Sequence, residues 1–533
     1  MKVKVFFVVS IAIPLLFLFP ILLHSATFIV DSAADTVDAS LGDGVCADGS
    51  GSCTLRAAIL ETNALTGADI IDLPAGTYIL NIVGRNEDAS FIGDLDITDD
   101  LTINGAAEST TLIDGNGIDR ALHIIGSIAE LSDLTLVNGD LPSGFGGGGG
   151  VLNEGTATFT NCTITGSRSS DQTGGLQNVG TATLTNCTIS NNDGGDDAGG
   201  IVNFGTVTLI DSTISGNVSS GFGDAAGILN MDTATLINCT ISNNDGGEGF
   251  GGIENAPGAI ATLTNCTIGS NVAQLSGGGL LNDGTATLTN CTISNNEAGE
   301  GGGIWNTGTV KLKNSIVANN TSGGDCFGEI TSLDNNLDSD GTCNLTEPND
   351  LPNTDPLLGE FTDDEVPGRG HFPLLEGSLA IDSGDDDCPL TDQLGNPRVD
   401  GDGDSFIVCD IGAVEFLPPY IEVEIDIKPG SYPNSIYLRS AGVIPVAILT
   451  TEDFDATTVD PLTVVFGPGG AMEFHEKGHI EDVDEDGDLD LALHFKNRET
   501  GIECDDIEVL LAGETYDGQD FIGSDNISTI GCE

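Results

Sequence analysis

The sequence predicts an all-β protein in which a parallel β-helix solenoid is followed by a C-terminal β-sandwich domain. Three observations predict it: an internal repeat of about 25 residues, strand-like alternation inside each repeat, and a new pattern after Pro418-Pro419. The chain has 533 residues, which is too long for one ordinary domain. We therefore expect several units, each with its own buried core.

Residues 1–26 have the features of an export signal. Two lysines precede an apolar run from Val5 to Leu23, and small residues at the end of the segment suit a cleavage point. The run is long enough to span a bilayer, but Pro14 and Pro20 interrupt it. We predict a cleaved signal peptide, with a retained anchor as the alternative. In both cases the rest of the chain is secreted or displayed on the cell surface.

The charge of the chain limits its partners. It carries 83 acidic and 15 basic residues, a formal net charge of -68, which repels nucleic acid and anionic membranes and attracts cations. We expect no nucleic-acid partner, no membrane contact beyond the N-terminal signal, and a monomer. Solubility or adaptation to salt explains an aspartate outside a motif equally well, so only local spacing can indicate a cation site.

The repeat fills the middle of the chain. Gly-Thr-Ala-Thr-Leu-Thr-Asn-Cys-Thr-Ile-Ser-Asn-Asn stands at 180–192 and again at 284–296. A period of this size is typical of a solenoid. Spacings of 24 to 27 residues separate the members of its anchor position, which are Cys162, Cys187, Ser212, Cys239, Cys266, Cys291 and Ser315.

Side-chain alternation within one repeat predicts the shape of a coil. Ala182 and Leu184 alternate with threonines, so the apolar side faces inward and the threonines face outward. After Asn186 the alternation shifts, and Cys187 and Ile189 become the inward pair, which indicates a corner. A third strand ends in a recurrent asparagine, so we expect a three-sided coil with stacked asparagine ladders. The ladder positions are Asn203, Asn230, Asn255, Asn282 and Asn306.

The competing solenoid is the leucine-rich repeat. The spacing of Leu184, Cys187, Ile189 and Asn192 does fit the strand template of that repeat. Leucine-rich repeats, however, need a compact return segment with its own leucines. Here the return is Gly-Gly-Asp-Asp-Ala-Gly-Gly followed by a second alternating strand, which favours the β-helix.

The thirteen cysteines fall into two groups. Five share the anchor position of the repeat, where we expect each to be a small buried hydrophobe. The other eight form plausible disulfides in an exported chain. The expected pairs are Cys46 with Cys53, Cys326 with Cys343, Cys388 with Cys409, and Cys504 with Cys532.

Three resemblances go with these patterns. Residues from about 100 to 325 resemble the right-handed parallel β-helix of the pectate-lyase-like superfamily, with the regular repeats at 126–325. Cys53-Thr54-Leu55-Arg56-Ala57-Ala58 resembles the Cys-Ser-Leu-Arg-Glu-Ala (CSLREA) motif of bacterial surface β-helix proteins, with threonine for serine and Ala57 for glutamate. That resemblance implies an N-terminal cap and irregular first coils at 27–125, and a capping role for Arg56 in preference to a catalytic one.

The third resemblance covers the end of the solenoid. Four segments in order are similar to the choice-of-anchor Q domain, which implies that 326–417 finishes the β-helix and that the protein is displayed on a surface. The segments are Asp355–Gly359, Gly377–Gly384, Thr391–Arg398 and Cys409–Glu415.

A separate domain is expected at 420–533. Its alternating stretches predict strands of a β-sandwich, and Ile425–Ser431 resembles a tail module of exported bacterial proteins. The stretches are 421–425, 443–449, 489–493 and 507–511.

One loop of this domain predicts a structural calcium site. Its carboxylates occupy loop positions 1, 3, 5, 7 and 9, with Gly487 at position 6. Such close carboxylates repel one another without a divalent ion, and calcium accepts many oxygens in flexible geometry. Leu493 at position 12 departs from the EF-hand, and a solvated acidic turn is the alternative. The predicted ligands are Asp482, Asp484, Asp486, Asp488 and Asp490.

Two other motifs receive less weight. Asp400-Gly-Asp402-Gly-Asp404 is a shorter acidic run, for which a flexible loop is the alternative. His475-Glu476-Lys477-Gly478-His479 spells a zinc-protease motif, which needs a helix. Flanking glycines leave no room for one, so we expect a surface turn or a supporting role beside the acidic loop.

The sequence favours a structural or adhesive surface protein, stabilised by calcium, that binds an extracellular polysaccharide or another cell-surface ligand. The alternative is a polysaccharide lyase or glycoside hydrolase. A lyase needs a basic residue near a calcium-bound uronate, and a hydrolase needs paired carboxylates. Between 127 and 320 the basic residues are Arg168, Lys311 and Lys313, and the repeats carry no recurrent acid pair. We therefore assign no catalytic residue.

Overall fold

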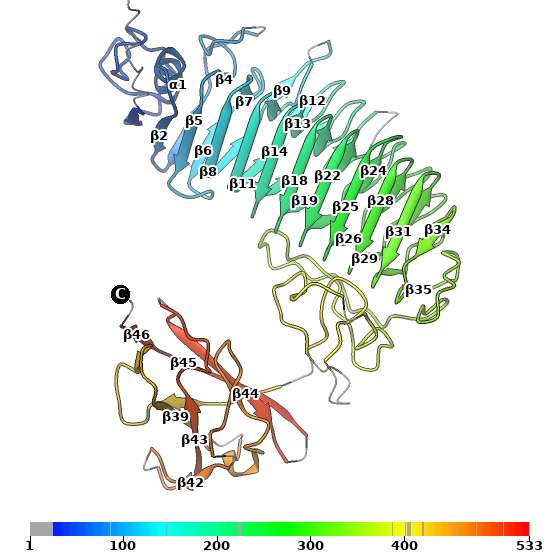
Figure 1. The fold of residues 1–533 in the computed structure, drawn as a ribbon. Coiled ribbons are helices and arrows are strands. Elements are labelled where there is room, and N and C mark those ends of the chain that lie inside the picture. The colour runs from blue at the N-terminus through cyan, green and yellow to red at the C-terminus, as the bar shows by residue number, and fades with distance from the viewer. Residues whose placement is uncertain are drawn as a thin grey trace, which may run out of the picture. The chain divides into compact units, whose positions relative to one another are not determined.

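The structure is a computed structural model that describes residues 25–531 except 86, 145, 222–224, 386, 400, 402–406, 418–419, 452–453, 476, 485, 505 and 517. The chain divides into two compact units, Met1–Phe416 and Leu417–Glu533 (Figure 1). Strands dominate both, which confirms the all-β class. The helices of the described residues are α1 (Leu55–Ala64) and the short 3-10 helix η1 (Ala456–Thr458). The predicted signal segment up to residue 24 lies outside the description.

The N-terminal end of the solenoid is closed by α1. Thr54 is its N-cap, and the Thr54 side chain accepts a hydrogen bond from the Ala57 N–H. Arg56 is buried and forms an ion pair with Asp35, with 2.5 Å between Nε and Oδ1. Its other nitrogens donate to the backbone carbonyls of Ser90, Gly93 and Asp94. The arginine therefore ties the helix to the first coils. Strand β1 (Thr27–Ile29) pairs with the first face described below.

Each coil of the solenoid except the last contributes one strand to each of three parallel faces, and the last coil contributes β34 and β35 to the first two (Figure 1). The first face contains β2 (Asp69–Leu73), β5 (Leu101–Gly105), β8 (Ile128–Val137), β11 (Thr156–Thr165), β14 (Thr181–Thr185), β18 (Thr206–Ile210), β22 (Thr233–Ile237), β25 (Ile260–Thr264), β28 (Thr285–Thr289), β31 (Thr309–Lys313) and β34 (Ile330–Ser332). The long strands β8 and β11 continue into the second face, which also contains β3 (Gly76–Ile79), β6 (Thr111–Asp114), β15 (Thr188–Ser190), β19 (Thr213–Ser215), β23 (Thr240–Ser242), β26 (Thr267–Gly269), β29 (Thr292–Ser294), β32 (Ile316–Ala318) and β35 (Leu337–Asp338).

The third face is a ten-stranded parallel sheet. It contains β4 (Leu95–Ile97), β7 (Leu122–Ile124), β10 (Val151–Asn153), β13 (Leu176–Asn178), β17 (Ile201–Asn203), β21 (Ile228–Asn230), β24 (Ile253–Asn255), β27 (Leu280–Asn282), β30 (Ile304–Asn306) and β33 (Cys326–Phe327). A short four-stranded ladder forms the turn before it, with β9 (Asp140–Leu141), β12 (Arg168–Ser169), β16 (Asp193–Gly194) and β20 (Val218–Ser219).

The inward side chains form one continuous core. It extends from Phe28 to Leu345, and each fully buried leucine or isoleucine in it contributes ~1.5–3 kcal/mol. The five repeat cysteines are free and buried, as predicted. The predicted corner is confirmed at Asn186, whose φ of 52° places it in the left-handed region that asparagine tolerates better than most residues.

The predicted asparagine ladder is confirmed. The Asn203 side-chain amide donates to Asn230 Oδ1 at 2.8 Å, and Asn230 donates to Asn255 Oδ1 at 2.8 Å. In the same way Asn255 donates to Asn282, and Asn282 donates to Asn306. The structure adds a second buried ladder that the sequence reasoning missed, through Asn192, Asn217, Asn244, Asn271, Asn296 and Asn320.

The described residues of 355–416 add no further coils. They fold back along the second face as irregular chain, drawn in yellow beside β26 and β29 in Figure 1. We call this stretch the return segment. Its backbone and one glutamine bind the threonine column of the second face, through Gly368 N–H to Thr213, Thr240 to Gly370 O, Thr267 to Gln393, and Ala413 N–H to Thr292. The return segment therefore covers the second face from β19 to β29.

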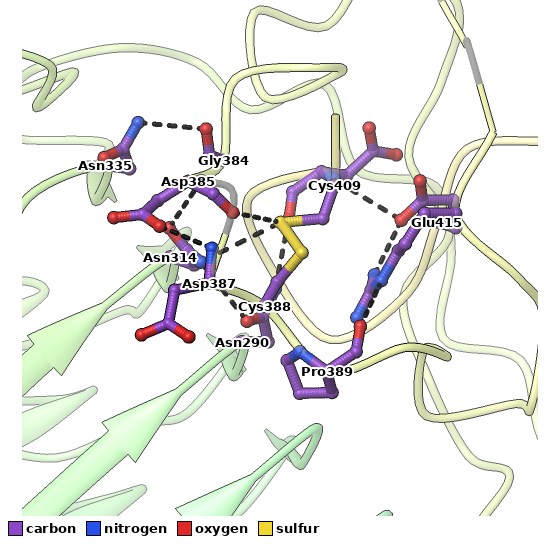
Figure 2. Close-up of a disulfide and its surroundings, with 12 residues drawn as sticks. Asn290, Asn314, Asn335, Gly384, Asp385, Asp387, Cys388, Pro389, Cys409 and Glu415 are labelled. Carbon is purple, nitrogen blue, oxygen red and sulfur yellow. Dashed lines mark hydrogen bonds and ion pairs between the residues drawn. A yellow bond between two sulfur atoms is a disulfide. The ribbon is translucent and has the colours of Figure 1, made fainter. Parts of the chain in front are cut away.

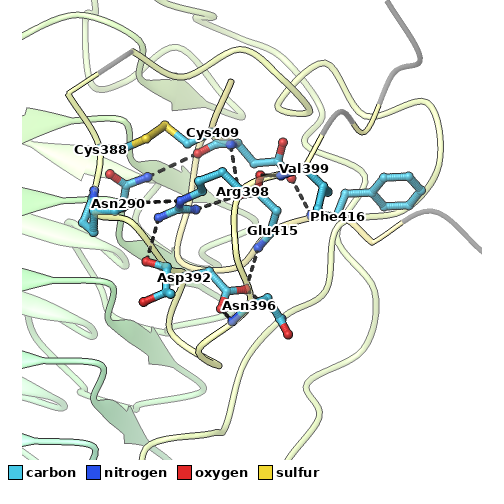
Figure 3. Close-up of polar contacts among 12 residues, drawn as sticks. Asn290, Cys388, Asp392, Asn396, Arg398, Val399, Cys409, Glu415 and Phe416 are labelled. Atoms are coloured by element: carbon cyan, nitrogen blue, oxygen red, sulfur yellow. Dashed lines mark hydrogen bonds and ion pairs between the residues drawn. A yellow bond between two sulfur atoms is a disulfide. The ribbon is translucent and has the colours of Figure 1, made fainter. Parts of the chain in front are cut away.

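Buried polar groups hold the return segment in shape. Figure 2 shows the disulfide between Cys388 and Cys409 beside Asn314, whose Oδ1 accepts from the Asp385 N–H at 3.1 Å. In Figure 3, Arg398 Nη1 lies 2.6 Å from Glu415 Oε2, and the Glu415 side chain is fully buried. Cys46–Cys53 and Cys326–Cys343 are also formed, as predicted. Cys504 is disulfide-bonded, but its predicted partner Cys532 lies outside the described residues.

The C-terminal unit is a sandwich-like arrangement of small sheets, as predicted. One sheet contains β36 (Ile421–Glu422), β45 (Asp520–Asn526), β44 (Glu508–Glu514), β40 (Val465–Phe466) and β41 (Ala471–Met472). The other contains β37 (Ile425–Ile427), β39 (Val443–Ile448), β43 (Asp490–Lys496) and β42 (His479–Glu481), and a third pair joins β38 (Ser435–Tyr437) to β46 (Ser528–Ile530). Its core includes Phe466, Phe495 and Phe521.

Candidate binding face and cation sites

The outward side of the first face is an ordered array of threonines. On the six strands β11, β14, β18, β22, β25 and β28, three columns of outward residues run in register. We call these eighteen positions the threonine face. Five, six and four of the six positions in the respective columns are threonine, and the other three positions are isoleucine. The middle column contains Thr158, Thr183, Thr208, Thr235, Thr262 and Thr287.

The threonine face is neutral, accessible and regular. None of its eighteen residues is charged, although the chain carries a net charge of -68, and each is at least partly exposed. In the described part of the chain, Thr233 alone among these threonines uses its hydroxyl in an intramolecular hydrogen bond, to Asp232. Strand geometry sets the hydroxyls in a lattice of roughly 4.8 Å between strands and roughly 6.7 Å along them.

A strip of exposed apolar side chains borders this face at one corner. Val179, Phe204 and Met231 follow the ladder asparagines of successive coils and are 44%, 43% and 46% exposed. Each stands two residues before the first threonine of its coil, so the strip and the threonine face are continuous. An aromatic ring at such an edge is suited to stacking on a sugar.

A second cluster lies in the first coils and was missed by the sequence reasoning. Asp96 on β4 and His123 on β7 are register partners, with 3.4 Å between Asp96 Oδ1 and His123 Nδ1. Glu154 Oε2 lies 3.2 Å from His123 Nε2, and Arg120 Nε lies 3.0 Å from Asp94 Oδ2. The signal available in the sequence was the break in the pattern, since charged residues here occupy positions that are mostly apolar in the later coils.

Burial and neighbouring charges shift the pKa values of this cluster. Burial, and then the charge of Asp96, raise the pKa of Asp94 to about 7 despite the neighbouring Arg120. Burial by itself lowers the pKa of His123, but its hydrogen bonds to Asp96 and Glu154 outweigh burial and raise it overall. One ligand atom each of Asp88, Asp96 and His123 also lie within 4.8 Å of one another.

The acidic loop brings three of its five predicted ligands together. One carboxylate oxygen each of Asp482, Asp484 and Asp490 lie within 4.8 Å of one another. Asp490, at the start of β43, is buried, and its two oxygens accept from the backbone N–H groups of Thr450 and Val483 at 2.8 Å.

The remaining two aspartates of the loop have a different placement. Asp486 and Asp488 lie in the turn, and the Asp486 carboxylate accepts from the Asp488 N–H at 2.9 Å. The Asp486 N–H lowers the pKa of Asp484, but desolvation and the carboxylates of Asp486 and Asp490 outweigh it, so that this pKa is raised. The three clustered oxygens are suited to a hard cation.

The second acidic run, 400–404, lies outside the description except for Gly401.

The zinc-protease string does not form its helix. His479 begins strand β42, and His475 lies in the turn that precedes it. The structure nevertheless brings both histidines to a third, His494 on β43, with one nitrogen of each ring within 4.8 Å. Burial, followed by the charges of the other two histidines, lowers the pKa of His494.

Comparisons with family models, with curated proteins and with solved structures gave no match. The family resemblances drawn from sequence motifs therefore stay predictions. Among the described residues, no helix is long and apolar enough to cross a membrane. The parallel β-solenoid and its disulfides fit an extracellular protein.

Proposed function

We propose that this protein is a secreted or surface-displayed scaffold whose threonine face binds an extended, uncharged polysaccharide outside the cell. The observation that carries the proposal is the neutral, in-register array of fifteen threonines and three isoleucines on a chain of net charge -68. A surface of this kind is complementary to a flat polymer that presents both hydroxyls and apolar faces.

The energetics of the threonine face favour binding by many small contacts. Each hydrogen bond to a sugar hydroxyl contributes ~0.5–1.5 kcal/mol, and each threonine methyl adds apolar contact. Threonine is stiff about χ1 and the strands are fixed in two ladders, so little conformational entropy is lost on binding. The surrounding acidic surface repels polyanions, which favours a neutral polymer.

Calcium has a structural role in this proposal. The cluster of Asp482, Asp484 and Asp490 supports a calcium site that closes the turn between β42 and β43. An ion there would offset the repulsion among the three carboxylates and fix Asp490 at the start of the strand.

The alternative function is cleavage of a polysaccharide. The buried cluster of Asp94, Asp96 and His123 favours it, because carboxyls with raised pKa values serve as general acids in glycoside hydrolysis. Its low exposure argues for a structural role: Asp96 is fully buried and His123 is 7% exposed.

A binding experiment separates these functions. The protein is incubated with insoluble cellulose and chitin and with soluble polyuronates, and both depletion from solution and new reducing ends are measured. We expect retention on a neutral polymer and no cleavage. Thr208→Lys with Thr235→Lys should reduce retention about tenfold or more, since two charges then interrupt the middle column. Lysine suits these strands, because β31 already has Lys311 in this column.

The matched control is Ser109→Lys, an exposed position outside the threonine face. It should bind as the unmodified protein does. New reducing ends that disappear on substitution of Asp94 would establish the enzyme instead, and retention that is unaffected by the two lysines would exclude the threonine face as the binding surface.

A further inference from the structure

Half of the histidines of this chain converge at one place in the C-terminal unit. The chain has six histidines, and His475, His479 and His494 lie with one ring nitrogen each within 4.8 Å of one another. The three ring planes cross at 71° to 89° with centroids 5.2 to 5.8 Å apart, so no pair is stacked. In each pair the edge of one ring meets the face of the other, and one nitrogen of each ring still lies within 4.8 Å of the other two.

Strand pairing explains how two of these residues meet. His479 on β42 is the register partner of Ala492 on the antiparallel strand β43. Directly opposed residues share a face of the sheet, and so does the residue two positions further along a strand. His494 therefore projects from the same face as His479, at a diagonal position.

Glu473 places the third histidine. Its side chain is buried; Oε2 accepts from the backbone N–H groups of His475 and Lys477 at 2.5 and 3.1 Å, and Oε1 from the His494 N–H at 3.3 Å. The same Oε1 lies 3.3 Å from His475 Nδ1. This contact leaves Nε2 of His475 available as a ligand, which is the carboxylate–histidine arrangement that orients metal-binding imidazoles.

His494 supplies a second observation that points to a ligand. Its Nδ1 atom is buried and has no hydrogen-bond partner among the described residues. An unpaired buried nitrogen is costly unless something binds it. A cation bound between the rings would satisfy it.

We propose that His475, His479 and His494 form a binding site for a borderline-soft divalent metal ion, with Zn²⁺ as its occupant. Three imidazoles suit zinc and exclude the hard-cation chemistry of the neighbouring acidic loop. Zinc–nitrogen bonds of ~2.0–2.1 Å in a tetrahedral site place the ligand nitrogens roughly 3.3 Å apart. Nitrogens that now lie within 4.8 Å of one another would therefore approach by at most roughly 1.5 Å. His475 and His479 are exposed, so their side chains are free to make that movement.

This site differs from the zinc-protease reading of the same residues. The turn and the strand replace the helix of that motif, and the third ligand comes from the next strand. Three protein ligands leave one position of a tetrahedral zinc open to water or another donor. The ion would also fasten β42, whose three residues are all exposed, to β43 at the end opposite the acidic loop.

Metal titration of the full-length protein tests the inference, with excess Ca²⁺ present to occupy acidic groups. Calorimetry with Zn²⁺ should show one saturable site, and Co²⁺ should give the visible absorption of a tetrahedral nitrogen complex. His475→Asn and His494→Gln should each weaken zinc binding roughly 100-fold or more, and Glu473→Gln about 10–100-fold. His371→Gln, in the other unit, is the matched control and should leave zinc binding unchanged.

Because His475 is exposed, the His475→Asn substitution should leave the fold intact. Circular dichroism of the variant would verify this. Equal zinc affinity in the unmodified, His475→Asn and His494→Gln proteins would overturn the inference. So would the absence of a saturable site. Neither result bears on polysaccharide binding by the threonine face, because that face belongs to the other unit.

Discussion

The threonine face of the solenoid and the β42–β43 edge of the C-terminal unit both present clustered polar groups, but they are built in opposite ways. The threonine face repeats one weak, neutral group over six strands, and each coil repeats the position of the last. The β42–β43 edge gathers three histidines and three clustered aspartates around one strand pair. Repetition suits contact with a polymer, whereas concentration of donors suits the binding of single ions.

The two regions also differ in what stabilises them. The solenoid is held by a continuous apolar core and by buried asparagine ladders that pass from coil to coil. The β42–β43 edge has a three-residue exposed strand and several repelling carboxylates. Loss of one ladder hydrogen bond should therefore destabilise the neighbouring coils as well. The stability of the β42–β43 edge should instead depend on bound cations.

The largest expected effect is on the asparagine ladder. Asn230→Ala removes an acceptor for Asn203 and the donor to Asn255 and to the Ile260 carbonyl, all in a buried site. We expect about 2–4 kcal/mol of destabilisation, since buried partners are left unsatisfied. Thermal or urea unfolding of the solenoid unit would measure it. Asn243→Gly, at an exposed left-handed corner, is the control and should cost less than about 1 kcal/mol. Equal losses in the free energy of unfolding of the two variants would contradict a stabilising role for the ladder.

Removal of calcium should affect the C-terminal unit alone. With calcium at about 100 times its dissociation constant, chelation should cost that unit about 2.7 kcal/mol, and its melting temperature should fall while that of the solenoid does not. Asp490→Asn should abolish the response. Asp488→Asn should leave most of it, because the Asp488 carboxylate lies outside the three-aspartate cluster. A melt that is insensitive to chelation would exclude the calcium site.

The smallest expected effect, counted per pH unit, concerns pH and the return segment. Burial, and then the charge of Glu415, raise the pKa of Asp410 to about 8. The folded-state pKa exceeds the unfolded value near 4, so the protonated group stabilises the fold fully below pH ~4, and this stabilisation is lost as the pH rises towards 8. The slope is at most ~1.4 kcal/mol per pH unit.

Melting temperatures of the solenoid unit between pH 5 and pH 8, measured at ~0.15 M salt, would test this effect. Asp410→Asn should flatten the decline, although it loses one of the two hydrogen bonds from the Asp382 and Phe416 N–H groups. The exposed Asp363→Asn should keep the slope of the unmodified protein. A variant slope equal to that of the unmodified protein would show that Asp410 does not titrate in this range.

The sequence predicted most of the solenoid because its signals are local and recur. The alternation around Leu184, the corner at Asn186 and the ladder through Asn203 each appear in coil after coil, so one coil predicts the others. The cysteine pairs Cys46–Cys53 and Cys326–Cys343 were also predictable, since their members are close in sequence.

The candidate sites were harder to predict from the sequence than the solenoid was. The histidine string was visible at 475–479, but its meeting with His494 depends on the pairing of β42 with β43. The carboxylate cluster needs Asp96 and His123, 27 residues apart, to become register partners on neighbouring coils. In both cases the pairing of two strands brings the side chains together. These stretches of sequence do not follow the repeat, so the pairing could not be predicted from its period.

By itself the sequence determined the coil: which residues face inward, where the chain turns, and that a neutral threonine column faces outward, because a fixed period assigns each residue type the same place in every coil. Only the tertiary structure decided which faces stay open. The return segment covers the second face from β19 to β29, through contacts such as Gly368 with Thr213, more than 150 residues apart. It leaves the threonine face uncovered within the unit. Such contacts depend on the path of an irregular chain, which no local pattern specifies.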